Sequence, residues 1–191
     1  MNTSTPFQMV QSIIDLDQGF LREIAQQIFL SGAFVLGSDM NDVHVVPVSD
    51  LGLTLPPDIN YTLRQYFPAT AYKNPRVRIG RRFPLHRMEC EENCLLLTVV
   101  LNTSILGHTM YALDPAKAND NAQTRADSVC LNPGDAFIHD RSMWMSFLPE
   151  SLDNDYIVMI QADCPYTTPE DRDKHLQEAM EIRQKLLSSN Q

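Results

Sequence analysis

The chain has 191 residues, of which 43% are hydrophobic and 20% are charged, and its formal charge at pH 7 is −9. This length fits one domain with its own core, and the composition is ordinary for a globular protein and argues against disorder. The negative charge argues against nucleic acid and anionic membranes as partners, because both attract basic surfaces.

The N-terminus and the cysteines predict a cytoplasmic protein. Residues 1–5 show neither the basic nor the apolar part of a signal peptide. The longest apolar runs, such as 95–101, are far shorter than the roughly 20 residues that span a bilayer. The 4 cysteines are too few for a disulfide framework in a chain of this length. Cys90 and Cys94 form a lone C-x3-C motif without a second pair at zinc spacing, so we expect free thiols.

The N-terminal part of the chain predicts helices and two short strands. Residues 15–30 fit an amphipathic helix that Gly32 can end, because apolar side chains recur every four positions at Leu16, Phe20, Ile24 and Ile28. Short β segments are expected at 33–36 and 43–48, and a short helix near 61–66. This part would support the core.

From about Arg76 onward, apolar residues alternate with polar ones or form short runs. Turn-forming stretches such as 132–134 separate these runs. A series of short strands with spaced turns favours a sandwich or barrel over a parallel α/β sheet. The expected strands are 77–83, 95–101, 108–113, 128–131, 135–139, 143–148 and 156–162.

The C-terminal residues predict a helix. Thr168 suits the N-cap position and Pro169 the first helical position, and Glu170 and Asp171 complement the helix dipole. We therefore expect a single domain, residues 1–191, with three parts: a helical and mixed N-terminal support (1–75), a strand-rich core (76–165) and a C-terminal helix (166–191).

Three segments carry a resemblance to a known family. They are P-L-H-R-M at 84–88 before the strand 95–101, L-N-P-G-D-A-F-I-H-D at 131–140, and the strand 156–163 followed by T-P-E-D-R at 168–172. In this order they resemble the aspartyl/asparaginyl and prolyl hydroxylase branch of the Fe(II)/2-oxoglutarate oxygenases. The resemblance implies a double-stranded β-helix core (jelly-roll, cupin-like) with flanking helices, and substrates derived from amino acids.

The resemblance also assigns positions to the family's ligands, and most of them carry other residues here. These oxygenases hold Fe(II) with two histidines and one carboxylate. His86 stands at the first histidine position, but Met88 stands at the carboxylate position and Met145 at the second histidine position. Asp155 lies where the arginine that binds 2-oxoglutarate is expected, and it would repel that cosubstrate. We therefore expect no cofactor, with Fe(II) and 2-oxoglutarate as the alternative. One imidazole with two thioethers would suit Cu(I) better than Fe(II).

The remaining polar residues are candidates for acid-base catalysis without metal. His86 would be the main general acid or base, assisted by His108, His139 or Tyr111, because imidazole exchanges protons near neutral pH. If Phe137 and His139 share the interior face of their strand, the three histidines could share one pocket. The simpler interpretation of His139 is a hydrogen-bonded residue at the rim.

Arginines and large side chains are candidates for substrate binding. Three arginines share one face of the strand 77–83, which we expect to be solvated: Arg76, Arg78 and Arg82. Arg81 falls on the other face with Val77 and Ile79, so it could point into the barrel and bind a carboxylate. A bulge or strand end that returns Arg81 to water is the alternative. Pocket-lining roles are predicted for Met88, Trp144 and Met145, with core packing as the simpler interpretation.

Three functions remain open. The first, which we favour, is a metal-independent isomerase, lyase or cyclase that acts on a small molecule. The second is an Fe(II)/2-oxoglutarate hydroxylase with unusual ligands, such as His86 with Glu89, His108 or His139. The third is a non-catalytic binding subunit. It remains open because function follows from the site, so a fold shared with enzymes does not by itself imply catalysis. The oligomeric state is open, with a homodimer as one arrangement.

Overall fold

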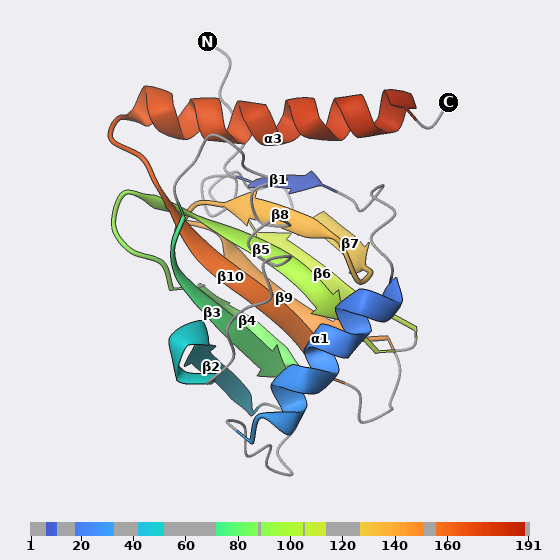
Figure 1. The fold of residues 1–191 in the computed structure, drawn as a ribbon. Helices are drawn as coiled ribbons and strands as arrows, with labels where there is room; N and C mark the ends of the chain where they lie inside the picture. The colour runs from blue at the N-terminus through green and yellow to red at the C-terminus, as the bar shows by residue number, and fades with distance from the viewer. Residues whose placement is uncertain are drawn as a thin grey trace.

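In the part of the chain that the structure describes, two antiparallel β-sheets and three helical segments form the fold (Figure 1). The computed structural model describes residues 7–10, 18–32, 42–51, 72–87, 89–104, 106–113, 127–150 and 156–189. The larger sheet contains β1 (Phe7–Val10), β2 (Val43–Pro47), β3 (Lys73–Gly80), β5 (Cys94–Asn102), β8 (Ala136–His139) and β10 (Ile157–Pro165). The smaller sheet contains β4 (Phe83–Arg87), β6 (His108–Leu113), β7 (Asp127–Leu131) and β9 (Trp144–Pro149). The helical segments are α1 (Gln18–Leu30), the 3-10 helix η1 (Val48–Leu51) and α3 (Pro169–Ser189).

The chain winds alternately through the two sheets. The larger sheet has the strand order β1-β8-β5-β10-β3-β2, and the smaller has β4-β9-β6-β7. From β3 to β10 the strands switch sheets at every step except between β6 and β7, which are neighbours in the smaller sheet. This is the winding of a jelly-roll, in which two sheets enclose one interior. We call the two sheets and the space between them the barrel.

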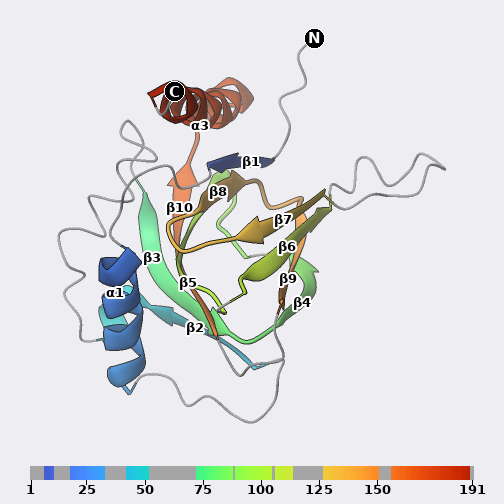
Figure 2. The same cartoon turned by 90° about the vertical axis from the view of Figure 1, so that its right-hand side faces the viewer.

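Both faces of the larger sheet are covered. Its outer face packs against α1, η1 and α3, and Figure 2 shows α1 on one side of this sheet and the smaller sheet on the other. Its inner face packs against the smaller sheet. Burial of these apolar side chains stabilises the fold by about 25 cal/mol per Å². The outer cluster includes Leu21, Ile28, Val77, Ile79, Leu97 and Ile160, and the inner cluster includes Phe83, Val100, Phe137, Met145, Phe147 and Met159.

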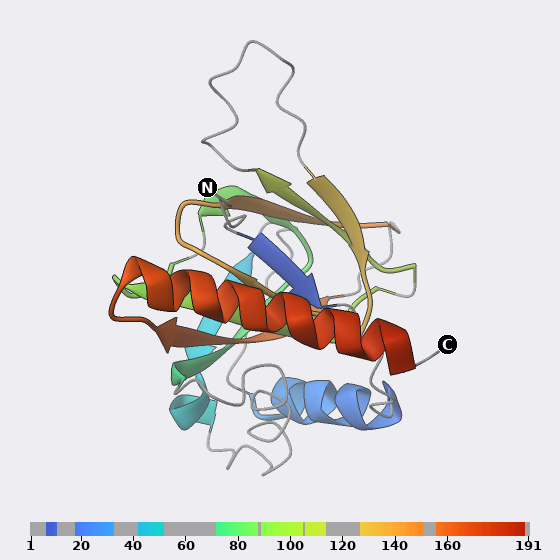
Figure 3. The same cartoon turned by 90° about the horizontal axis from the view of Figure 1, so that it is seen from above.

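The C-terminal helix α3 begins where the sequence predicts. The Thr168 Oγ1 accepts a hydrogen bond from the Asp171 amide at 3.1 Å, and the Asp171 carboxylate accepts one from the Thr168 amide at 3.2 Å. These reciprocal bonds satisfy amides that the first helical turn leaves unpaired. Seen from above, α3 lies across β1 (Figure 3). An ion pair between Arg172 and Asp140 ties the helix to the end of β8.

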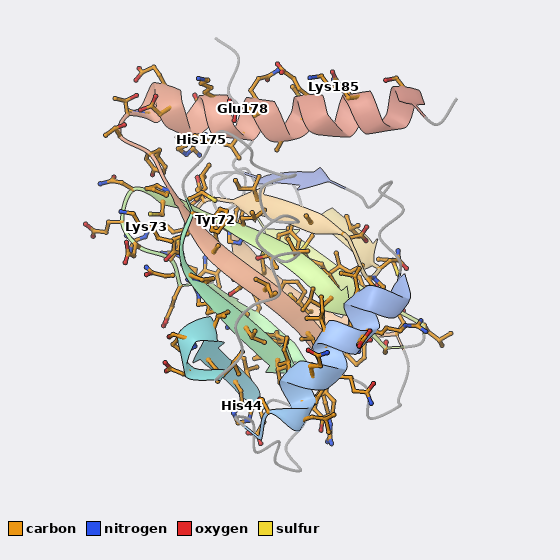
Figure 4. All side chains as sticks on the ribbon, viewed as in Figure 1. His44, Tyr72, Lys73, His175, Glu178 and Lys185 are labelled. Carbon is orange, nitrogen blue, oxygen red and sulfur yellow. The ribbon has the colours of Figure 1, made fainter. Side chains whose placement is uncertain are left out.

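Two side chains of α3, His175 and Glu178, lie close together. Figure 4 labels both, and their Nδ1 and Oε2 atoms are 3.8 Å apart. Both residues therefore belong to the helix and lie outside the barrel interior. No helix in the described part of the chain is long and apolar enough to cross a membrane.

Most of the predicted elements are confirmed, with two differences. The strand predicted at 77–83 is wrong as a single strand, because β3 ends at Gly80 and the chain turns into β4 at Phe83. A Cβ atom at Gly80 would lie 2.9 Å from the Phe83 ring, so glycine is what permits this tight turn. The short strand β1 was not predicted. The elements expected at 33–36 and 61–66 lie outside the described residues.

The predicted turn at 132–134 is confirmed, and it shows how the P-G-D motif works. Gly134 has a φ of 91°, a conformation that glycine adopts without steric cost. Its amide donates a hydrogen bond to the Val100 carbonyl at 2.7 Å, and the Asp135 carboxylate accepts one from the Asn132 amide at 2.7 Å. The motif therefore fixes the entry of β8, which carries His139 at its end.

Candidate functional site

An open cavity of about 640 Å³ lies beside β2, β3 and β4. This volume is within the range of small-molecule sites. Its apolar wall comes from β2, and its polar wall comes from β3, β4, the segment after β4 and the end of β10. The lining residues are Val43, Val45, Asn74, Arg76, Arg78, His86, Arg87, Glu89, Cys90, Glu91 and Asp163.

Arg76 and Arg78 face this cavity because of the way β3 alternates. Val77 and Ile79 are fully buried in the outer cluster, so Arg76 and Arg78, which alternate with them, point to the inner side of the larger sheet. This corrects the sequence prediction that Arg76 and Arg78 lie on a solvated face. The alternation of side chains along the strand correctly predicted which residues share a face. It could not show that the charged face is the inner one, because both faces of β3 are covered.

His86 and Arg78 are in direct contact at the cavity wall. The Arg78 Nη2 atom lies 2.9 Å from His86 Nε2, and His86 Nδ1 lies 2.6 Å from the Pro84 carbonyl oxygen. A carbonyl only accepts, so the proton is on Nδ1 and Nε2 uses its lone pair to accept from the guanidinium. Burial lowers the pKa of His86 and the positive charge of Arg78 lowers it further, although the hydrogen bond to Pro84 raises it. His86 is therefore neutral at neutral pH, with a basic nitrogen next to a cation.

The two arginines of β3 differ in their counter-charges. Arg76 forms an ion pair with the buried Asp163, at 3.0 Å, and also donates to the Glu89 carbonyl at 2.7 Å. Arg78 has no ion pair within the described ranges, and its Nε atom is buried without a hydrogen-bond partner. Burial and the neighbouring charge of Arg76 lower the pKa of Arg78 to about 10, although the charge of Glu89 raises it. Arg78 is thus a half-buried cation whose hydrogen-bonding capacity is only partly used.

His139 belongs to the same electrostatic neighbourhood as His86 and Arg78. Its side chain is fully buried at the end of β8, and its Nδ1–H donates to the Asp140 carbonyl at 2.7 Å. Its Nε2 atom has no partner among the residues that the structure describes. Burial lowers the pKa of His139 to about 4, and repulsion from Arg78 and from the protonated form of His86 contributes to the lowering. His139 is therefore a neutral hydrogen-bond acceptor inside the barrel.

Met145 lies opposite His86 on the paired strands β4 and β9. Its side chain is fully buried in the inner cluster. The position that the resemblance assigns to the second metal histidine is therefore adjacent to the first, but it carries a thioether. Met88, at the position assigned to the carboxylate, lies outside the described residues.

His108 lies at the other end of the barrel. It pairs with Pro149 on β9, whereas His86 pairs with Met145, so the two are separated by about 13 Å along that strand at about 3.3 Å per residue. The Nδ1 atom of His108 accepts from the Ser104 amide at 3.1 Å, and its Nε2 lies 3.2 Å from the Arg81 carbonyl oxygen. The structure does not bring His108 into one pocket with His86, and its contacts hold two turns in place.

Three other predicted site residues lie outside the lining of the cavity. Arg81 sits in the turn after β3, where its Nη2 donates to the Tyr156 hydroxyl at 2.7 Å and its guanidinium lies 4.9 Å from that ring. Tyr111 is 36% exposed, and it alternates with Met110 and Ala112, which face the interior. Trp144 packs against the guanidinium of Arg87 at 5.2 Å. Glu89 does line the cavity.

Sequence reasoning missed Arg78 and Asp163 as site residues. The signal for both was present in the alternation of their strands. On β10, Val158 and Ile160 belong to the outer cluster, so Gln161 and Asp163 face inward. Charged residues that alternate with buried apolar ones on two neighbouring strands indicate a polar patch inside a sheet protein.

The donor atoms near His86 do not fit Fe(II). No group of three or more His, Cys, Asp or Glu that could hold a metal occurs among the described residues. The Nε2 atom of His86 already accepts from a guanidinium, and a cation at 2.9 Å would repel a metal ion. The residue opposite His86 offers a thioether, which is a poor ligand for Fe(II).

Comparisons with known proteins give the fold of this chain. No family model and no curated protein matches the sequence. The structure resembles the non-heme alpha-ketoglutarate-dependent epimerase SnoN from nogalamycin biosynthesis, with 13% identity over 84% of this chain and 77% of that chain and a TM-score of 0.58. It also resembles the alpha-ketoglutarate-dependent carbocyclase SnoK of the same pathway, with 10% identity over 84% and 79% and a TM-score of 0.54.

A third structure extends this likeness to the hydroxylases. A prolyl hydroxylase from Trichoplax adhaerens, solved in complex with a hypoxia-inducible factor peptide, has 14% identity over 94% of this chain and 87% of that chain, with a TM-score of 0.50. The chain therefore has the double-stranded β-helix fold found in the Fe(II)/2-oxoglutarate oxygenases, and the predicted fold class is confirmed. At these identities the likeness establishes the fold alone.

Proposed function

We propose that this protein is a cytoplasmic enzyme that acts on a small molecule as an isomerase, lyase or cyclase, without metal, by proton transfer at His86. The contact between His86 and Arg78 at the wall of an open cavity is the observation that carries the proposal. It joins a neutral base to a cation. Such a pair can remove a proton from a substrate and stabilise the negative charge that develops there.

The protonation state of His86 suits a general base. Because its pKa is lowered, the imidazole is unprotonated at neutral pH, and its Nδ1–H is oriented by the Pro84 carbonyl. The Nε2 atom is then the only ring atom that can accept a proton. It would return the same proton at another carbon or to a leaving group. In either case the atoms balance without an oxidant.

The fold is compatible with this chemistry. SnoN is described as an epimerase and SnoK as a carbocyclase, so isomerisation and ring closure occur on this fold in those proteins. Both are described as alpha-ketoglutarate dependent, and our proposal differs on this point because of the donor set around His86. Residues positioned by the fold would perform the reaction in place of a metal centre.

The mass of the product tests the proposal. Chelator-treated protein is incubated with a metabolite extract in the absence of oxygen, and products are followed by mass spectrometry. We expect a product of unchanged mass, or fragments whose masses sum to that of the substrate. His86→Gln should abolish turnover, whereas His175→Gln on α3 should retain it. A second incubation in air with added Fe(II) and 2-oxoglutarate serves as the comparison. The proposal is wrong if only this second incubation consumes a substrate and its product gains an oxygen atom, if His86→Gln stays active, or if neither incubation consumes a substrate.

A further inference from the structure

The guanidinium of Arg78 has an unused hydrogen-bond donor beside the cavity. Its Nε–H is buried without a partner, and its Nη2 donates to a neutral acceptor, His86 Nε2, at 2.9 Å. The neighbouring Arg76, in contrast, has its charge matched by Asp163 at 3.0 Å. A half-buried cation without an ion-pair partner is unfavourable, and an anion that reached it would remove this cost.

A carboxylate fits this edge of Arg78 better than the imidazole does. Two N–H groups of one guanidinium edge match the two oxygens of a carboxylate, and this bidentate pair also neutralises the charge of the guanidinium, which a neutral imidazole cannot do. The cavity is lined by Val43 and Val45 on the other side, which offers a surface for an apolar body attached to the anion. Asp163 is engaged by both Arg76 and Asn74, so it does not compete for Arg78.

We propose that the substrate carries a carboxylate, that this group binds the Nε–Nη2 edge of Arg78, and that it displaces the bond from Arg78 to His86. The displaced His86 then presents a free Nε2 lone pair next to the bound substrate. Arg78 masks the base in the free protein, and the correct substrate unmasks it. This inference rests on the proposed function for its role in catalysis, but the binding event can be measured without turnover.

Substrate binding and base activation are coupled in this arrangement. A neutral molecule of the same shape would leave Arg78 on His86 and the base unavailable. Discrimination between an acid and its amide would then come from one residue, because only the anion competes with the imidazole. Arg78 thus acts as the specificity-determining residue, and His86 remains the reacting group.

Binding of simple carboxylates tests this directly. Acetate, propionate and benzoate are titrated into the chelator-treated protein, with benzamide as the neutral control, and NMR follows the Nε–H signal of Arg78 and the ring nitrogens of His86. We expect at least one acid to bind about tenfold or more tightly than its amide and to shift both signals. Arg78→Gln should lose this binding, and Arg82→Gln, which alters an exposed arginine outside the cavity, should keep it.

The variant His86→Phe tests the inference by the direction in which it changes the affinity for carboxylates. It removes the acceptor that competes for Arg78, so carboxylate binding should become tighter. If His86→Phe weakens binding, if acids and amides bind alike, or if no acid binds, the inference is wrong. If Arg78→Gln fails to fold, the titrations of the wild type and of His86→Phe still show whether the inference is right. These binding results do not depend on turnover. A failure of the proposed function would be seen as an oxygen-dependent product, and it is therefore distinguishable from a failure of this inference, which would be seen in the titrations.

Discussion

The buried His139 makes a quantitative prediction about stability and pH. Its pKa falls from 6.5 to about 4 on folding because burial disfavours the charged ring. The unfolded chain therefore binds a proton more readily than the folded chain at any pH between these two values. By linkage, the stability that comes from keeping His139 neutral is fully present above pH 6.5 and is lost as the pH falls toward 4.

The magnitude follows from the two pKa values. Between pH 7 and pH 5 this single group should lower the free energy of unfolding by about 2 kcal/mol. The variant His139→Asn removes the titrating ring but keeps a short donor for the Asp140 carbonyl. It should be less stable than the wild type at pH 7, because it loses the ring that stacks on Phe137 at 6.1 Å. The gap between the two proteins should then narrow by about 2 kcal/mol at pH 5.

Urea unfolding followed by the fluorescence of Trp144, the 1 tryptophan of the chain, measures this gap at each pH. Met145→Leu is the matched control, since it alters interior packing without a titrating group, and its gap to the wild type should not change with pH. A gap for His139→Asn that stays constant from pH 7 to pH 5 would refute the assignment of a buried, neutral His139.

Two further predictions concern the framework of the barrel. Gly32 and Gly107 both have positive φ, at 73° and 92°, but only at Gly107 would a Cβ atom meet close neighbours, Cys130 Sγ at 2.8 Å and the Leu131 carbonyl at 3.3 Å. In urea unfolding, Gly32→Ala should cost about 1 kcal/mol and Gly107→Ala clearly more, and equal costs would contradict the described turn. A double-mutant cycle of Asp140→Asn and Arg172→Gln should give a coupling of about 0.5–3 kcal/mol at pH 7. Although burial raises the pKa of Asp140, hydrogen bonds from Ser142 and Arg172 lower it below 3.8 overall, so the coupling should be present above about pH 4 and lost as the pH falls through the folded pKa.

The sequence was sufficient for the strands because local patterns determine them. The run 95–101 and the P-G-D turn predicted β5 and the entry of β8, and Thr168 with Pro169 predicted the start of α3. The order of three motifs predicted the double-stranded β-helix. The resemblance assigned His86 and Met145 to two ligand positions of one site, and the two residues lie opposite each other where β4 pairs with β9.

The site was harder to predict because it depends on strand pairing and on which face of a strand is inside. The pairing of β6 with β9 places His108 beside Pro149, away from His86, and no local pattern encodes this register. Alternation along β3 predicted two faces, one apolar and one charged. Because the charged face of such a strand is usually exposed to solvent, we expected Arg78 to face water. The larger sheet is covered on both sides, so this expectation fails, and Arg78 lies at the centre of the candidate site.

Anaerobic titration of the chelator-treated protein with Fe(II) and 2-oxoglutarate tests the central claim most directly. The claim is that His86 accepts from Arg78 and does not belong to an iron centre. We expect no visible charge-transfer band at any ratio of the two reagents, and unchanged NMR signals for the His86 ring nitrogens. A saturable band that disappears in His86→Gln would contradict the claim and identify the protein as a metal-dependent oxygenase.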